Sequence, residues 1–163
     1  MSLSTLLQNI ADAQSGPETC AVFDFDGTII SGYSATAFLK DQIARGEISP
    51  ADLVQLTHAA TRFGIGSLGF SALMAVHAQY LAGRSEADYI ANSERLFRRA
   101  IAKLIYPEAR QLIEAHRAAG HSIAIISSAT PYQVLPAAKD LGIEHVYATD
   151  LEVEYGQFTG GVV

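Results

Sequence analysis

The sequence predicts an α/β fold in which a parallel sheet carries an inserted helical region. Three short apolar runs, at residues 20–24, 122–127 and 145–149, have the length and composition of buried strands. Helical patterns alternate with these runs, as expected for a parallel sheet with right-handed crossovers. Roughly seventy residues of helical pattern separate the first run from the second, far more than one crossover helix requires. We therefore expect residues 34–105 to form a helical insertion.

One helix and a linker are expected before the first strand. Four apolar residues at helical spacing predict a short amphipathic helix over residues 3–13: Leu3, Leu6, Leu7 and Ile10. Gly16 and Pro17 indicate a linker at 14–19. The apolar run from Cys20 to Phe23 then has the pattern of a buried strand.

Four helices are expected within the insertion, at about 34–45, 50–63, 70–82 and 85–103. Ser34 and Ser49 are predicted N-caps, and a proline at the first helical position follows the second of them. Ser85 with Asp88 resembles a capping box. The glycine-rich residues 64–69 are expected to interrupt the insertion between its second and third helices.

Beyond the insertion, helices and strands alternate again. The expected elements are a helix at 107–119, a strand at 122–126, a helix at 131–141, a strand at 145–149, and a hairpin of 151–153 with 157–159. Thr130 followed by Pro131 is a cap-and-proline helix start, and Gly142 ends that helix. Tyr155 and Gly156 supply the hairpin turn.

Composition excludes several classes of protein. Eleven Lys and Arg against 17 Asp and Glu give the 163 residues a net charge of −6, which argues against a general nucleic-acid binder. Apolar residues make up 49%, too many for a disordered chain, and the single cysteine, Cys20, excludes an internal disulfide. The longest apolar stretch, 68–81, falls short of a membrane span, and no secretory signal is visible. We expect a cytoplasmic protein.

The most informative motif is Asp24-Phe25-Asp26-Gly27-Thr28, directly after the first strand. In extended geometry Asp24 and Asp26 point the same way, at the strand end where open α/β sheets place their sites. Two adjacent carboxylates repel each other, and a divalent cation removes that conflict. Hard oxygen ligands of this kind suit magnesium. The alternative is a polar turn with two solvated aspartates.

A second polar segment, Ser127-Ser128-Ala129-Thr130, follows the second strand and precedes a helix that starts at Pro131. Neighbouring parallel strands bring their carboxyl ends together, so Ser127 is expected beside Asp24. The helix N-terminus offers unpaired backbone amides, which favour an anion. The alternative is that Ser128 or Thr130 only caps the helix.

These segments resemble a known family. Residues 24–30 are similar to the first motif of the haloacid dehalogenase (HAD) superfamily, and 125–130 resemble its second motif. The long helical insertion and residues 147–160 resemble its subfamily IB, the phosphoserine-phosphatase-like branch. The resemblance implies a Rossmann-like core, here a partial parallel sheet, with an all-helical C1-type cap. It divides the chain into an N-terminal helix and linker (1–19), a core (20–33 and 106–163) and a cap (34–105).

The resemblance also implies a function and a site. The protein would be a phosphomonoesterase that uses Mg²⁺ and an aspartyl-phosphate intermediate, with Asp24 as nucleophile and Asp26 as general acid and base. Magnesium would be held by Asp24 and Asp26, through the carboxylate of the first and the backbone carbonyl of the second. The residues expected to hold the phosphate are Gly27, Thr28, Ser127 and Ser128.

Two departures from the family pattern bear on substrate and completeness. Tyr33 occupies the position where phosphoserine phosphatases have a glutamate that reads the substrate amine, so we expect a small phosphorylated substrate other than phosphoserine. The family's third motif, a lysine, and its fourth, an acidic pair, would follow Val163. The core is therefore expected to be incomplete, and this chain alone to be weakly active or inactive. The open edge of the first strand could then pair with another chain to form a dimer.

Two alternatives remain open. Residues 30–35 and the apolar cap resemble a HAD module of a phospholipid-biosynthesis enzyme, the 1-acylglycerol-3-phosphate acyltransferase fusion, which would make the substrate lipid-related. The other alternative is a catalytically inactive fragment. A basic run on the last cap helix is either a solvated face or a contact with an anionic substrate or lipid: Arg95, Arg98, Arg99 and Lys103. The five histidines share no ligand spacing and are expected mostly at the surface or at helix ends.

Overall fold

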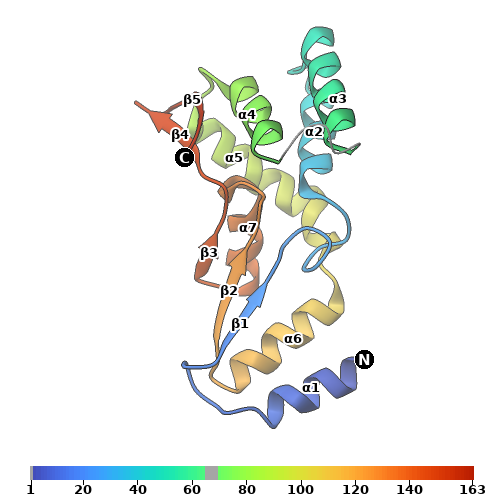
Figure 1. Ribbon diagram of the computed structural model, residues 1–163, viewed down its shortest axis with the longest axis vertical. Helices are drawn as coiled ribbons and strands as arrows, with labels where there is room; N and C mark the ends of the chain where they lie inside the picture. The colour runs from blue at the N-terminus through green and yellow to red at the C-terminus, as the bar shows by residue number, and fades with distance from the viewer. Residues whose placement is uncertain (1, 65–69) are drawn as a thin grey trace.

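The computed structural model of the chain describes residues 2–64 and 70–163, and a three-stranded parallel sheet lies at its centre (Figure 1). The strands are β1 (Cys20–Phe23), β2 (Ser122–Ile126) and β3 (His145–Tyr147), in the order β1-β2-β3. All three lie where the sequence predicts strands, although β3 ends two residues earlier than expected. The parallel α/β class is confirmed, and β1 forms an edge of the described sheet.

Three helices pack around this sheet. Helix α6 (Pro107–Ala118) contacts β2, helix α7 (Pro131–Leu141) contacts β3, and helix α1 (Leu3–Ala11) packs against α6. Ile113, Ile125 and Val134 come from α6, β2 and α7 and are almost completely buried. On the other side of the sheet, Val22 and Ile126 are more than half exposed, so the described elements cover mainly one face.

The region 34–105 is helical in the residues that the structure describes. It contains α2 (Ser34–Ala44), α3 (Pro50–Gly64), α4 (Phe70–Leu81) and α5 (Glu86–Leu96). Figure 1 shows these helices beyond the carboxyl ends of β1 and β2. The predicted interruption at 64–69 lies, except for its first residue, outside the described residues. The side chain of Ser85 accepts a hydrogen bond from the backbone of Asp88 at 3.3 Å, which confirms that predicted cap.

The last cap helix ends differently from the expectation of a regular helix to about residue 103. Helix α5 ends at Leu96 and continues as a π turn, η1 (Phe97–Ile101), and a 3₁₀ turn, η2 (Ala102–Leu104). The sequence does not reveal this change, because Phe97 and Ile101 are buried at a spacing of four residues, which is also the spacing of an α-helix.

The C-terminal residues form the predicted hairpin, with β4 (Leu151–Glu154) antiparallel to β5 (Gln157–Val162). Tyr155 and Gly156 both have positive φ at its turn, 50° and 75°, as two-residue hairpin turns of the I′ type require. The hairpin packs on α4, and the backbone N–H of Gly83 donates to the carbonyl of Phe158 at 2.8 Å. The expected core range 106–163 thus includes a hairpin whose main contacts lie with the helical region.

The histidines follow the expectation only in part, because His77, within α4, is half-buried and His121 is buried. His58 and His145 are exposed. His121, however, is buried, and its Nδ1 lies 2.9 Å from Nδ1 of His116. The sequence does not indicate this buried contact, because it depends on how α6 meets β2. As for membrane contact, no helix among the described residues is both long enough and apolar enough to cross a bilayer.

Candidate functional site

The two predicted site segments leave adjacent strands. Strands β1 and β2 pair in parallel with Phe23 opposite Ile125, so Asp24 and Ser127 follow within two residues of paired positions at the same end of the sheet. Asp24 is exposed, and its Oδ1 accepts a hydrogen bond from the backbone of Phe25 at 2.7 Å. The structure therefore offers the Asp24 carboxylate to solvent at the carboxyl edge of the sheet.

The loop after Asp24 turns around a single buried side chain. Phe25 is 0% exposed, and its carbonyl accepts from the backbone N–H groups of Thr28, Ile29 and Ile30 at 3.3, 2.9 and 3.1 Å. Gly27 has φ of 77°, in the left-handed region that favours glycine. Gly27 and Thr28 are both exposed beside the two aspartates.

Asp26 is held by the start of α2. Its Oδ1 accepts from the backbone N–H of Ser34 at 2.7 Å, and its Oδ2 accepts from the hydroxyl of Ser34 at 3.1 Å. Burial raises the pKa of Asp26, the two bonds from Ser34 partly offset that rise, and the charge of Asp24 adds to it. The two aspartates thus differ in environment, one open to solvent and one half-buried and hydrogen-bonded.

The predicted N-cap role of Ser34 is wrong. Helix α2 begins at Ser34, Tyr33 is the N-cap residue, and Tyr33 makes no side-chain cap bond. The Ser34 hydroxyl donates to Asp26 instead, because the loop from Asp26 brings that carboxylate to the first turn of α2. Asp26 therefore serves as the acceptor at this helix start, a position that favours a negative charge.

The second segment is fixed by β3 and by its own turn. The Ser127 N–H donates to the Tyr147 carbonyl at 2.9 Å, and the Thr149 hydroxyl donates to the Ser128 carbonyl at 2.9 Å. Ser127 Oγ accepts from the Ala129 N–H at 3.1 Å. A hydroxyl that accepts in this way can still donate its own hydrogen to an anion. Ser127 is largely buried, whereas Ser128 is exposed.

One residue of this region, Gln133, is not among those that the sequence predicts. Its Oε1 accepts from the backbone N–H and the hydroxyl of Thr130 at 2.8 and 2.9 Å, and its Nε2 donates to Ser34 Oγ at 2.9 Å. The available signal was the spacing Thr130-x-x-Gln133, because a capping box places Gln at this position. That signal explains the contact with Thr130, but it does not indicate the contact with Ser34.

The aspartates offer a partial set of magnesium ligands. Asp24 presents an exposed carboxylate, and both carboxylate oxygens of Asp26 already accept from Ser34. The Asp24 carboxylate and the Asp26 backbone carbonyl are both hard oxygen donors, the ligand type that magnesium prefers. Within the described residues no group of three or more His, Cys, Asp and Glu side chains is placed to hold a metal.

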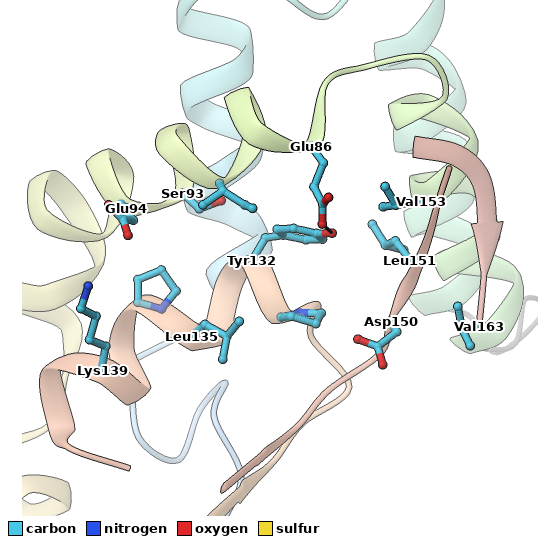
Figure 2. Close-up of a pocket in the computed structure, with 13 residues that line it drawn as sticks. Glu86, Ser93, Glu94, Tyr132, Leu135, Lys139, Asp150, Leu151, Val153 and Val163 are labelled. Carbon is cyan, nitrogen blue, oxygen red and sulfur yellow. Dashed lines mark hydrogen bonds between the residues drawn. The ribbon is translucent and has the colours of Figure 1, made fainter. Parts of the chain in front are cut away.

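A cavity of about 620 Å³ lies elsewhere, between α5, α7 and the β4–β5 hairpin (Figure 2). Figure 2 shows Tyr132 and Glu86 directed toward one another, and the Tyr132 hydroxyl donates to Glu86 at 2.8 Å. None of the predicted site residues lines this cavity. Its size therefore does not make it the candidate site.

A groove of about 550 Å³ begins at Tyr33, next to Ser34, the residue that donates hydrogen bonds to Asp26. It lies between α2 and the η1–η2 turns, and its lining includes Tyr33, Lys40, Arg99 and Lys103 around small apolar residues of α2 and η1. Tyr33 is 71% exposed and immediately precedes Ser34. Asp41, buried in the same groove, pairs with Arg45 and Arg95 at 2.8 and 2.9 Å, and Arg99 lies 4.0 Å from it, so its charge is already compensated.

Comparison with known proteins gives a consistent result. The model of the family "haloacid dehalogenase-like hydrolase" matches residues 21–163. A phosphoserine phosphatase of Mycobacterium tuberculosis is 32% identical over 148 residues, which cover 88% of this chain and 48% of that protein. The chain spans about half the length of the first curated relatives that it matches.

Solved structures agree in fold. A Bordetella pertussis protein of unknown function superposes with a TM-score of 0.80 at 24% identity, over 89% of this chain and 66% of that one. A phosphoserine phosphatase, solved as an analogue of its phospho-aspartyl intermediate, gives a TM-score of 0.60 at 20% identity, over 88% and 62%. The mixed α/β fold with a parallel sheet is thus shared with these proteins.

Proposed function

The chain belongs to the haloacid dehalogenase-like hydrolases, and on that premise we propose that the protein is a magnesium-dependent phosphomonoesterase that works through an aspartyl phosphate. The observation that carries the proposal is the difference between two aspartates at one strand end. Asp24 is exposed and available for attack, whereas Asp26 is held by Ser34 in a half-buried position. One carboxylate that is free to bond and one that is fixed and able to carry a proton are what this chemistry requires.

The proposed reaction has two steps. A carboxylate oxygen of Asp24 attacks phosphorus, the bond from phosphorus to the leaving oxygen breaks, and Asp26 gives its proton to that oxygen. Asp26 then takes a proton from water, the water oxygen attacks the aspartyl phosphate, and inorganic phosphate leaves with Asp24 restored. Bound magnesium would supply positive charge that offsets the charge of the phosphate oxygens. Ser127 and the backbone around Gly27 and Thr28 would hold the phosphate oxygens.

The substrate proposed is a small phosphomonoester that lacks a recognised ammonium group. Tyr33 stands at the mouth of the groove beside the site, and a phenol carries no charge to pair with an amine at neutral pH. A relative named phosphoserine phosphatase is 32% identical to this chain, so phosphoserine is the reference against which other substrates are compared. We expect kcat/KM for phosphoserine to be no higher than for an uncharged alkyl phosphate of the same size. A clear preference for phosphoserine would contradict this part of the proposal.

A second candidate substrate is a lipid-related phosphate, and the groove favours it. Three cations border apolar side chains there, which suits a ligand with an anionic head and an acyl chain: Lys40, Arg99 and Lys103. Lysophosphatidate and glycerol 3-phosphate share the phosphate and differ in the acyl chain. If these cations hold the anionic head, Arg99→Gln should raise KM for both substrates, and a lower wild-type KM for lysophosphatidate than for glycerol 3-phosphate would indicate that the apolar side chains take the acyl chain. Arg98→Gln is the matched control, because Arg98 is a neighbouring exposed arginine outside this groove.

The central test is hydrolysis of p-nitrophenyl phosphate by the full-length protein with Mg²⁺. Asp24→Asn keeps the size of the side chain but removes the nucleophile, so turnover and acid-stable protein-bound phosphate should both disappear. Asp88→Asn, the same change at an exposed aspartate of α5, should leave both intact. Activity of Asp24→Asn near the wild-type level would rule out the aspartyl-phosphate mechanism.

A further inference from the structure

A continuous path of hydrogen bonds links Asp26 to the start of α7. It runs through side chains 99 residues apart in sequence, from Gln133 Nε2 to Ser34 Oγ at 2.9 Å and from Ser34 to Asp26 at 2.7 and 3.1 Å. We propose that Ser34 and Gln133 are positioning residues that hold the Asp26 carboxylate in the orientation from which it serves the leaving group. This inference rests on the proposed function, because it assigns Asp26 the proton transfer.

The contact between Gln133 and Thr130 determines which group donates and which accepts in each hydrogen bond of the path. Gln133 Oε1 accepts twice from Thr130, from the backbone N–H at 2.8 Å and from the hydroxyl at 2.9 Å. The amide oxygen is therefore committed to Thr130, and Nε2, which can only donate, faces Ser34. Ser34 Oγ accepts that bond, so its own hydrogen is left to donate to Asp26 Oδ2. Each hydrogen bond in the path thus has one defined donor and one defined acceptor.

Because these groups are buried, loss of any of their hydrogen bonds costs free energy. Ser34 and Thr130 are 0% exposed and Gln133 is 6% exposed. A polar group buried at such a site costs free energy when it loses its partner, so rotation of any one side chain would strand its neighbour. The Asp26 carboxylate is held at both oxygens by a donor pair that is itself fixed. Displacements of about 1 Å at a reacting group can cost a large factor in rate.

The competing explanation is a purely structural one. Asp26 satisfies the first backbone N–H of α2, and Gln133 satisfies the backbone N–H of Thr130, the N-cap residue of α7, so both could serve only to cap helices. If these residues only cap helices, their replacement should lower stability and should change the rate by the same factor for every substrate. Positioning predicts a loss of rate that grows as the leaving group becomes more basic, because only a poor leaving group needs the proton. The two explanations therefore separate in a substrate series.

The experiment uses the full-length protein with dinitrophenyl, nitrophenyl, phenyl and alkyl phosphates. Ser34→Ala removes the hydroxyl, and Gln133→Glu replaces the donor Nε2 with an oxygen that attracts the Ser34 hydrogen away from Asp26. We expect kcat/KM, which reports formation of the aspartyl phosphate and not its later hydrolysis, to fall about 10- to 100-fold for phenyl and alkyl phosphates and by less than about threefold for dinitrophenyl phosphate, because general acid catalysis contributes about 10²–10⁴-fold in total. Ser34→Thr keeps a hydroxyl and should retain most of the wild-type rate.

Ser93→Ala is the matched control. Ser93 is also a buried serine of the helical region 34–105, 2% exposed, and it lies within α5. Its hydroxyl donates to the Tyr89 carbonyl at 2.8 Å and not to Asp26. It should lower the melting temperature without any dependence on the leaving group. If Ser34→Ala does not fold, Gln133→Glu and Ser34→Thr carry the test.

The inference is overturned if Ser34→Ala and Gln133→Glu lose the same factor for every leaving group, or lose nothing. That outcome is distinct from failure of the proposed function. In the latter case the wild-type protein forms no covalent phosphate, or Asp24→Asn still turns over. A wild-type protein that is phosphorylated on Asp24, with variants that show no leaving-group dependence, would remove only the positioning roles of Ser34 and Gln133.

Discussion

The two ends of the parallel sheet each carry a buried polar contact between distant segments. At the carboxyl end, Gln133 and Ser34 direct their hydrogen bonds toward Asp26. At the amino end, His121 Nδ1 lies 2.9 Å from His116 Nδ1, and His121 Nε2 lies 3.1 Å from the carbonyl oxygen of Gln14. Neither glutamine nor serine changes charge with pH, whereas histidine does so near neutrality.

The two contacts therefore differ in how they respond to pH. A carbonyl only accepts, so His121 Nε2 carries a hydrogen, and the Nδ1 of neutral His121 accepts from Nδ1–H of His116. A proton added to His116 would place a positive charge on a half-buried ring beside His121, and burial and that neighbour both lower the pKa of His116. The contact at the carboxyl end has no such alternative state between Gln133 and Ser34. We therefore expect changes at the carboxyl end to affect rate and changes at the amino end to affect stability.

The largest effect is expected from Asp26→Asn in the full-length protein. An amide cannot carry the proton, so kcat/KM for phenyl phosphate, which reports formation of the aspartyl phosphate, should fall by about 10²–10⁴-fold, and much less for dinitrophenyl phosphate. His116→Asn, at the other end of the sheet, should leave both rates within about twofold, because proton transfer does not involve it. A similar loss of rate in both variants would show that the two ends are not independent.

A smaller effect is expected from Ser127→Ala. Its hydroxyl hydrogen is available because Oγ already accepts from Ala129, and a hydrogen bond to a charged group contributes about 1.5–3 kcal/mol. The dissociation constant for inorganic phosphate should rise about 10- to 100-fold, with the rate of the covalent step less affected. Ser122→Ala, at the opposite end of β2, is the control, because Ser122 donates to Pro17 and not toward the site. Unchanged phosphate affinity in Ser127→Ala would exclude it from phosphate binding.

Much of this arrangement follows from local sequence. Strand β2 and the start of α7 were predicted because apolar runs and the pair Thr130-Pro131 act over a few residues. The placement of Asp24 near Ser127 also follows, since parallel pairing brings equivalent strand ends together. These inferences need only the element type and the order of the strands.

The remaining features depend on contacts that local patterns do not encode. A serine at a helix start predicts a cap, and nothing near Ser34 indicates that its partner is Gln133, 99 residues away. The His116–His121 contact is similar, because it joins the end of α6 to the residue before β2 and then to Gln14. The hairpin was predicted by its turn, but its packing on α4 is a tertiary choice that alternation along the strands cannot show.

At the amino end, His121→Leu should weaken the attachment of the N-terminal segment. The change removes the bond to Gln14 and the bond to His116 from a buried residue, and we expect a loss of about 1–2 kcal/mol in the free energy of unfolding. Hydrogen exchange should accelerate in residues 3–19 while kcat is retained. His145→Leu, the same change at an exposed histidine, should alter neither. Unchanged exchange in His121→Leu would show that the contact does not hold α1.

The smallest effect should appear as a dependence of stability on pH. Burial, and then the charge of His121, lower the pKa of His116. A histidine whose pKa is lowered on folding binds more protons when unfolded, so its contribution to stability is complete above about pH 6.5, the unfolded value, and is lost as pH falls toward the folded value. No carboxylate lines the cavity around the pair within the described residues, so none is placed there to compensate an added charge.

Urea unfolding at pH 7.5 and pH 5 would measure this effect. His116→Asn keeps a donor near the position of Nδ1 but does not titrate, so the wild-type protein should lose more free energy of unfolding than this variant between the two pH values. Burial also lowers the pKa of His77, to about 4, which adds acid instability of the same sign to both proteins. The difference between them therefore isolates the pair. Parallel pH curves for the two proteins would show that the histidine contact carries no pH dependence, and that the two ends of the sheet do not differ in this respect.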